Sequence, residues 1–189
     1  MLSLHMMSVE TGQILLPTGL GVFFLGWSES GIRRIILPDL TEKPAPSRGH
    51  TDAGETASLP DFMEEACARI KAYAAGARDD FASVPVDLSG LDVFRRAIYE
   101  TVRKVGCGET VTYGELCQRA GFPGKPRETG AALGRNPVPL IVPCHRVLAA
   151  GNRPGGFSAP GGVASKMRLL AHEGVDLSPP PPAQAAFVF

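Results

Sequence analysis

A cysteine, a histidine and an arginine follow one another directly after an apolar run in the second half of the chain. Pro143 separates this run, Leu140–Val142, from the thiol. Because proline fixes its own φ and lacks an N–H, we expect it to end an extended segment and to hold Cys144 at the floor of a pocket. A thiol is a useful nucleophile only as thiolate, and His145 and Arg146 supply groups that could lower its pKa. The alternative is that Cys144 is a small buried hydrophobe.

The composition is that of an ordinary folded protein in a reducing compartment. Hydrophobic residues make up 44% and charged residues 20% of the 189 positions, enough for one large domain or two small ones. No apolar run approaches the ~20 residues of a membrane helix, and no signal peptide is indicated, so we expect a cytoplasmic protein without membrane contact. The cysteines form no C-x-x-C pair, and phosphate-loop motifs are missing, so we expect no disulfide framework, metal or cofactor. The four cysteines are Cys67, Cys107, Cys117 and Cys144.

The charge is distributed unevenly although the whole chain is neutral. Residues 1–88 hold 7 basic and 12 acidic residues, whereas residues 89–189 hold 12 basic and 7 acidic residues. The half that carries the cysteine–histidine pair is therefore the basic one. Such asymmetry favours a polyanion partner for that half, and a chance split of surface charge is the alternative.

The first half is predicted to contain strands and one helix. Residues 11–37 are rich in β-branched and aromatic residues, and the turn-forming residues 28–31 indicate a hairpin. Residues 39–60 have the composition of a loop, and the apolar spacing of residues 61–75 predicts an amphipathic helix. We expect Asp61 and Glu64 to form a capping-box-like start of that helix. A linker at 81–90 then leads into the second half.

The second half is predicted to be mostly helical. Thr112 and Glu115 have the spacing of a capping box, and Pro126 suits the first turn of a helix. Two short helices joined by the glycine-containing turn 121–124 resemble a helix-turn-helix, with Arg127 near the end that usually contacts DNA. As a bare pattern this is nonspecific. The predicted helices are 92–105, 113–120, 126–133 and 163–172.

Four motifs in this half are similar to one known family. They are Gly108–Tyr113, Gly134–Pro137, Pro143–Val147 and Leu169–Gly174, in this order. Together they resemble the O6-alkylguanine-DNA alkyltransferases, also called methylated-DNA–protein-cysteine methyltransferases. The resemblance covers about residues 91–175, and the earlier residues are similar only in layout.

The resemblance implies a catalytic group of four residues. Cys144 would accept the alkyl group in a one-step displacement that uses up the protein. His145 would act through a bridging water as the base for the thiol, and Glu173 would orient His145. Asn136 would shape the turn around the thiol.

The resemblance also implies a partner, double-stranded DNA that contains O6-alkylguanine, bound by a monomer. Tyr113 would donate to the leaving guanine or crowd the phosphate of the flipped nucleotide. Arg127 would fill the gap in the base stack, from a helix that lies in the minor groove. The Ser158 region of the glycine-rich loop would contact O6. Arg135, Gly156 and Phe157 complete the residues expected to contact DNA or substrate.

The implied architecture is α/β (α+β). Residues 1–88 would form a small β-meander with a helix, in a ribonuclease-H-like layout. Residues 89–177 would form the DNA-binding alkyltransferase domain with the helix-turn-helix, and residues 178–189 a flexible tail.

Three positions depart from the family pattern. Glu128 is acidic on the face expected to meet phosphates, which opposes DNA attraction. Phe157 stands where some relatives have tyrosine, and Gly106 begins a segment in which a proline is common. One alternative function is therefore a module that recognises alkylated DNA or regulates transcription with weakened chemistry. A Cys–His hydrolase is a further alternative, although such pairs normally come from distant segments.

Overall fold

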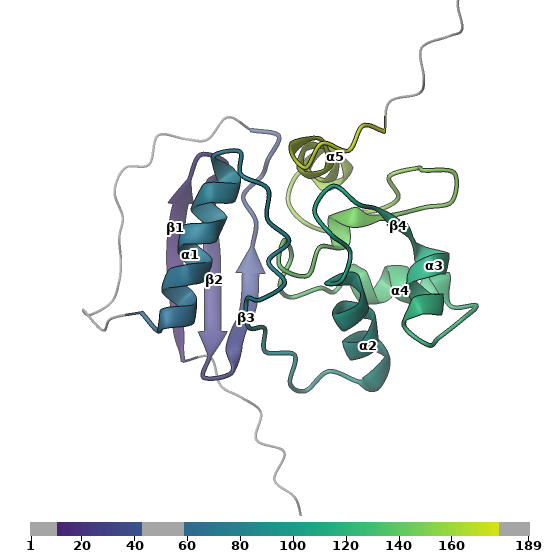
Figure 1. Ribbon diagram of the computed structural model, residues 1–189, viewed down its shortest axis with the longest axis horizontal. Helices are drawn as coiled ribbons and strands as arrows, with labels where there is room; N and C mark the ends of the chain where they lie inside the picture. The colour runs from purple at the N-terminus through teal and green to yellow at the C-terminus, as the bar shows by residue number, and fades with distance from the viewer. Residues whose placement is uncertain (1–10, 43–58, 178–189) are drawn as a thin grey trace, which may run out of the picture.

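An antiparallel sheet forms one side of the molecule. The computed structural model describes residues 11–42 and 59–177, and its sheet has the strand order β1–β2–β3 (Figure 1). The hairpin predicted at residues 28–31 is present, because β2 and β3 pair with Ser28 opposite Gly31. Gly31 has a φ of 141°, a conformation that side-chain-bearing residues rarely adopt. The strands are β1 (Gly12–Thr18), β2 (Gly21–Ser28) and β3 (Gly31–Ile36).

One face of this sheet is covered by helix α1 (Asp61–Ala74), as Figure 1 shows. The helix buries the apolar positions that its spacing predicts, from Met63 to Tyr73. The predicted capping box is wrong. Pro60 is the N-cap, it has no side-chain acceptor, and its carbonyl oxygen instead accepts from the N–H groups of Met63 and Glu64 at 2.8 and 3.1 Å.

In the second half, as far as residue 177, four helices lie beside the sheet. Thr112 and Glu115 form the predicted capping box at the start of α3, and Pro126 occupies the first turn of α4. A short parallel pair joins β4 (Val111–Thr112) to β5 (Val147–Leu148) and so ties the segment before α3 to the segment after the cysteine. The helices are α2 (Val93–Val102), α3 (Tyr113–Arg119), α4 (Pro126–Leu133) and α5 (Gly162–His172). The fold is thus a mixed α/β architecture.

The connection between the two halves is packed rather than free. Phe81 and Val84 of the predicted linker are buried in the core. The Arg103 guanidinium donates to the carbonyl oxygens of Ala82 and Val84 at 2.9 and 2.6 Å. A side chain of α2's C-cap therefore holds this segment in place.

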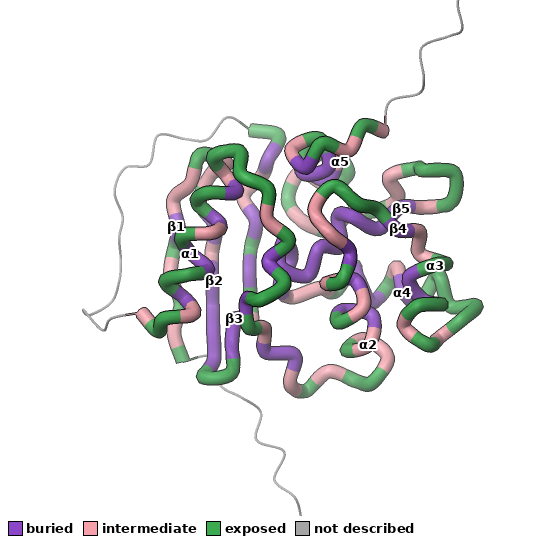
Figure 2. The backbone as a smooth tube through the Cα atoms, viewed as in Figure 1, coloured by how far each residue is buried: buried purple, intermediate pink, exposed green. Residues whose placement is uncertain are grey.

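The run before the cysteine is a tight turn, so the predicted extended segment at Leu140–Val142 is wrong. Leu140 has a positive φ of 78°, and the Val142 N–H donates to the Val138 carbonyl at 2.9 Å. Burial explains the apolar composition, since all three residues of the run have no exposed surface (Figure 2). A 3₁₀ turn, Cys144–Arg146, follows directly.

Some predicted features lie outside the described residues. These are the tail at 178–189 and most of the loop at 39–60. Among the residues that the structure describes, none of the helices is both long and apolar enough to span a bilayer.

Candidate active site

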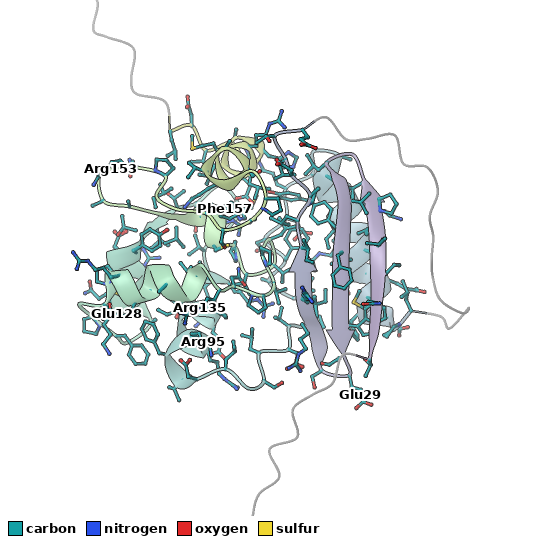
Figure 3. All side chains as sticks on the ribbon, turned by 180° about the vertical axis from the view of Figure 1, so that it is seen from behind. Glu29, Arg95, Glu128, Arg135, Arg153 and Phe157 are labelled. Atoms are coloured by element: carbon teal, nitrogen blue, oxygen red, sulfur yellow. The ribbon has the colours of Figure 1, made fainter. Side chains whose placement is uncertain are left out.

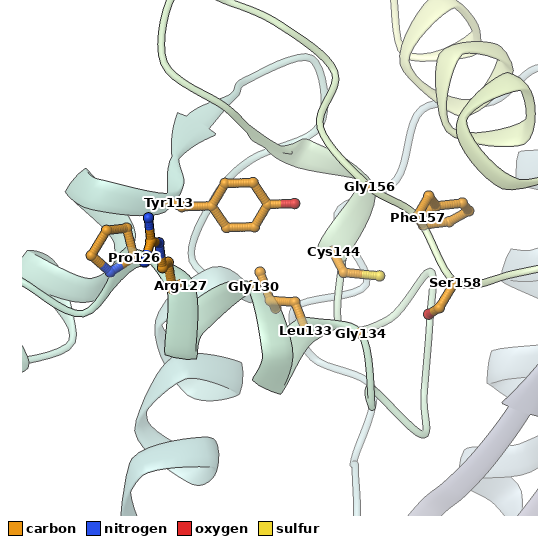
Figure 4. A pocket seen from close by; sticks show the side chains of 10 residues that line it. All are labelled: Tyr113, Pro126, Arg127, Gly130, Leu133, Gly134, Cys144, Gly156, Phe157 and Ser158. Carbon is orange, nitrogen blue, oxygen red and sulfur yellow. The ribbon is translucent and has the colours of Figure 1, made fainter.

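The Cys144 side chain reaches a cavity of about 480 Å³ (Figure 4). This volume lies in the range of sites that hold a small organic molecule. Helices α3 and α4 form one wall, and the glycine-rich loop before α5 forms the other. The cavity brings together six of the predicted site residues. Its lining is Tyr113, Pro126, Arg127, Gly130, Leu133, Gly134, Cys144, Gly156, Phe157 and Ser158.

The thiol at this site is largely buried, and it is a thiol rather than a preformed thiolate. Cys144 is 8% exposed. Burial raises its pKa, and this outweighs the opposing effects of a hydrogen bond with Asn136 and of the charge of Lys166. The expectation that Arg146 supplies the nearby positive charge is not supported, because Arg146 is turned toward Glu173.

The cation that acts on the thiol is Lys166, which the sequence analysis did not single out. It lies on α5 with no exposed surface, and its Nζ donates to the Val147 carbonyl at 2.5 Å. Burial lowers its pKa to about 8, against an ordinary value of 10.5. Its Nζ also lies 6.0 Å from the centre of the Tyr113 ring. In the sequence a lysine on an amphipathic helix is indistinguishable from a solvated one.

Asn136 holds the turn that leads to the thiol. Its Nδ2 donates to the Val142 carbonyl at 2.7 Å, and its Oδ1 accepts from the Val138 N–H at 3.0 Å. Both bonds lie within the turn between Asn136 and Cys144, and a role of Asn136 in shaping the site stays a prediction.

Behind the cavity, His145 and Glu173 form a completely buried pair. The His145 Nε2 lies 2.9 Å from Glu173 Oε1, and both side chains have 0% exposure. Burial lowers the pKa of His145, and the neighbouring carboxylate offsets this only in part. His145 is thus neutral at pH 7. Its Nδ1 is buried and has no hydrogen-bond partner among the described residues.

Glu173 is the acceptor at the centre of a larger cluster. Arg146 donates to it twice, from Nε at 2.8 Å and from Nη2 at 2.9 Å. Burial alone would raise the pKa of Glu173, but the hydrogen bonds from His145 and Arg146 hold it well below its usual range. Glu173 is therefore ionised and can only accept. It follows that Nε2 of His145 carries the ring proton and that Nδ1 is an acceptor.

Tyr113 stands between two glycines that leave room for its ring. A Cβ at Gly130 would lie 3.8 Å from the ring, and one at Gly155 would lie 3.2 Å from the hydroxyl. Burial raises the pKa of Tyr113, so it keeps its proton. Arg127 is exposed at the first turn of α4, on the rim of the cavity.

The remaining predicted positions lie around this cavity. Arg135 is exposed just beyond the end of α4 and does not line the cavity (Figure 3). Glu128 is exposed on the first turn of the same helix. In the described part of the chain, no group of three or more His, Cys, Asp or Glu side chains is placed to hold a metal ion.

A buried thiol at the floor of a cavity, with an imidazole and a carboxylate behind it, defines a protein built around a cysteine nucleophile. Residues 93–175 match the family described as "6-O-methylguanine DNA methyltransferase, DNA binding domain".

Relatives and solved structures agree with this match. A methylated-DNA–protein-cysteine methyltransferase of Methanothermobacter thermautotrophicus is 34% identical over 151 residues, 80% of this chain and 78% of that protein. A "DNA base-flipping protein" of Thermus thermophilus is 41% identical over 84% of this chain and 97% of its own length. The Mycobacterium tuberculosis OGT structure in complex with DNA is similar at a TM-score of 0.65 and 30% identity, over 86% of this chain and 92% of that one. This chain belongs to the family of methylated-DNA–protein-cysteine methyltransferases.

Proposed function

We propose that this protein is a DNA repair alkyltransferase that moves the alkyl group of O6-alkylguanine in DNA onto Cys144, once per molecule. The observation that carries the proposal is the position of the sulfur. It reaches a cavity large enough for one purine, and the His145–Glu173 pair stands behind it.

The reaction is one displacement. The sulfur attacks the alkyl carbon, the S–C bond forms as the C–O6 bond breaks, and the bonding pair leaves on guanine O6. The thiol proton goes to His145 Nδ1 through a bridging water. The leaving guanine anion takes up one proton from solvent, and His145 returns its proton to solvent. Tyr113 retains its hydroxyl proton and donates a hydrogen bond to the departing base. A thioether is a poor leaving group, so Cys144 is not regenerated.

Charge balance explains how a thiol with a raised pKa can react. Arg146 already neutralises Glu173, so a proton on His145 adds a buried positive charge. A thiolate on Cys144 compensates that charge, and Lys166 stabilises the thiolate further. The thiol proton therefore moves to His145 only as the substrate is attacked. Before that, Cys144 is a neutral thiol and His145 a neutral imidazole.

The DNA contacts follow from α3 and α4. We assign these helices as a helix-turn-helix whose second helix enters the minor groove of double-stranded DNA. Arg127 fills the gap in the base stack, since extrusion of a base costs a few kcal/mol of unstacking. Ser158, Gly156 and Phe157 form the opposite wall around the base, and Arg135 contacts the backbone beyond α4.

In this proposal residues 1–88 are a ribonuclease-H-like support, residues 89–177 carry the chemistry, and the protein acts as a cytoplasmic monomer. A cofactor is not part of the reaction, because the thiolate itself is the acceptor.

Intact-protein mass spectrometry tests the proposal. The protein is incubated with an excess of duplex that contains one O6-methylguanine. The expected result is one added methyl group, located on the peptide that holds Cys144, and restored guanine in the DNA. Cys144→Ser is the control and should remain unmodified. DNA binding with no adduct on the wild-type protein would reject the proposal.

A module that recognises alkylated DNA or regulates transcription, with weakened transfer chemistry, is the second candidate. It is favoured by Glu128 on α4 and by the similarity to a protein named for base flipping. Glu128→Gln should then raise DNA affinity and the transfer rate. Glu64→Gln, an equal charge change at an exposed position of α1, is the control. If Glu128→Gln alters neither quantity, the ground for this candidate disappears.

A further inference from the structure

Tyr73 is a buried polar side chain that the mechanism above does not use. It lies near the end of α1, in the first half of the chain, and has 0% exposure. Its hydroxyl donates to Glu173 Oε1 at 3.0 Å, a contact between residues 100 positions apart. Burial raises the pKa of Tyr73 strongly, so the hydroxyl keeps its proton and acts as a donor.

Two other aromatic rings pack against the ring of Tyr73. The His172 ring lies 4.5 Å from it and the Phe81 ring 5.5 Å, measured between ring centres. The His172 Nε2 also lies 2.7 Å from the Tyr73 carbonyl oxygen. These contacts hold the Tyr73 hydroxyl in place beside the Glu173 carboxylate, so the packing around the ring supports the hydrogen bond.

Glu173 Oε1 is shared by three donors. Tyr73, His145 and Arg146 approach it at 3.0, 2.9 and 2.9 Å. The backbone N–H of Gly108 is a further, longer donor to Oε2 at 3.4 Å. Because the negative charge is divided among these donors, the hydrogen bond from Nε2 of His145 is weaker than it would be to an unshared carboxylate oxygen.

We propose that Tyr73 is a positioning residue for alkyl transfer, which acts through Glu173 to keep His145 in the neutral form that can accept the thiol proton. This inference rests on the proposed function. It gives the first half of the chain a part in the chemistry, because α1 supplies the hydroxyl.

The direction of the effect follows from the shared oxygen. Without the hydroxyl, Oε1 draws more strongly on the Nε2 proton, and Nδ1 becomes more basic. His145 then takes up a proton at higher pH, and a protonated His145 cannot accept the thiol proton. The acid limb of the rate–pH profile should therefore move to higher pH, by roughly half a unit to one unit for one hydrogen bond to a charged group.

Other charged and titratable groups face the His145–Glu173 pair, and the Tyr73→Phe substitution leaves these groups in place. The 3₁₀ turn contributes one arginine and the nucleophile, α5 contributes one lysine, and the segment before β4 contributes a half-buried thiol. These groups are Arg146, Cys144, Lys166 and Cys107.

The experiment compares wild type with Tyr73→Phe and with a matched control. Ser28→Ala removes another buried hydroxyl that donates to a carboxylate, Asp87 at 2.7 Å, in the sheet. For each protein, ¹⁵N-histidine NMR follows the titration of His145, and single-turnover transfer from an O6-methylguanine duplex is measured between pH 5 and pH 8. Thermal unfolding of all three proteins shows that they are folded under these conditions.

The expected result is specific to Tyr73→Phe. His145 titrates at higher pH, and the acid limb of the transfer rate moves with it, so that at a fixed pH on this limb transfer slows roughly threefold to tenfold, in proportion to that shift. Ser28→Ala changes neither. An unshifted His145 titration, or a loss of rate that is equal at every pH, would overturn the proposal. A wild-type protein that transfers no alkyl group would reject the proposed function, whereas the titration still decides the role of Tyr73.

Discussion

Cys144 and Lys166 are both buried, and the charge of each group shifts the pKa of the other. Lys166 provides a positive charge near the sulfur. Keeping this lysine charged lowers the stability of the folded protein, since burial lowers its pKa to about 8. Its Nζ is held at the Val147 carbonyl, which fixes the charge on the side of the thiol. In the proposed mechanism, Lys166 thus lowers the stability of the fold but stabilises the thiolate of Cys144.

This cost can be measured as a function of pH. In the unfolded chain Lys166 has its ordinary pKa of 10.5, so between pH 8 and pH 10.5 the unfolded state binds more protons. Stability therefore rises with pH in this window. In a Cys144→Ala background, which removes the thiol titration, we compare Lys166 with Lys166→Met by urea unfolding. The difference in unfolding free energy should move by about 3 kcal/mol in favour of the lysine from pH 8 to pH 10.5.

A constant difference across this range would show that the ammonium is not desolvated in the folded protein. Transfer by Lys166→Met, measured with Cys144 present, should in contrast slow at pH 7, because the thiolate loses its cation.

At the scale of elements, α3 and α4 place Tyr113 and Arg127 on the rim of one cavity. Arg127→Ala tests the role of α4 in extrusion. We expect about tenfold slower transfer from duplex DNA, since the gap in the stack stays unfilled. Transfer from free O6-benzylguanine should remain within about twofold of wild type, because a free base needs no extrusion. Equal losses on both substrates would place Arg127 in the chemistry instead.

Local signals explain which elements could be predicted from the sequence. The Thr112–Glu115 capping box depends on residues three apart, and the hairpin at Gly31 on a turn of four residues, so both are visible in the chain. The Leu140–Val142 run was predicted as extended because apolar residues before a proline suit a strand. Its true form is a turn that Asn136 ties together, and composition does not encode that.

In the candidate site, too, residues in local motifs could be predicted, whereas residues defined by long-range contacts could not. Tyr113, Cys144 and the His145–Glu173 pair lie within the four motifs, and the other predicted lining residues were assigned by the family resemblance; all lie at or directly behind the cavity. Arg135 alone stands apart. Lys166 and Tyr73 were missed because a buried lysine looks like a surface one in sequence, and because the partner of Tyr73 is 100 residues away.

For the whole molecule, a neutral histidine and an ionised carboxylate in the core predict sensitivity to acid. The folded-state pKa of His145 lies below 6.5, and that of Glu173 lies below 4.5. As pH falls through each ordinary value, the unfolded chain takes up the proton first, so both groups lower stability in the same direction. The unfolding free energy should fall with pH below about 6.5, with a slope of at most about 1.4 kcal/mol per pH unit from His145 alone.

Urea unfolding of wild type and His145→Gln between pH 7 and pH 5 measures this contribution. The variant should show the shallower slope in this range, because glutamine does not titrate. Identical slopes would mean that His145 has the same pKa in the folded and the unfolded protein, and a steeper slope in the variant would mean that His145 is protonated in the folded protein; either result contradicts its role as a neutral base.

The Arg103 guanidinium donates to the carbonyls of Ala82 and Val84, and the Ile35 N–H of β3 donates to the Pro137 carbonyl at 2.8 Å. Hydrogen bonds thus hold the segment between the two halves and join the sheet to the turn before Cys144, so we expect the halves to move little relative to each other when a substrate enters. In the proposed function, a duplex that docks on α4 would then meet a nearly rigid protein surface, and the DNA would have to supply most of the distortion that brings a nucleotide to the sulfur. On that proposal, selectivity among lesions would depend first on how easily each damaged base pair opens, and only then on contacts between the protein and the base.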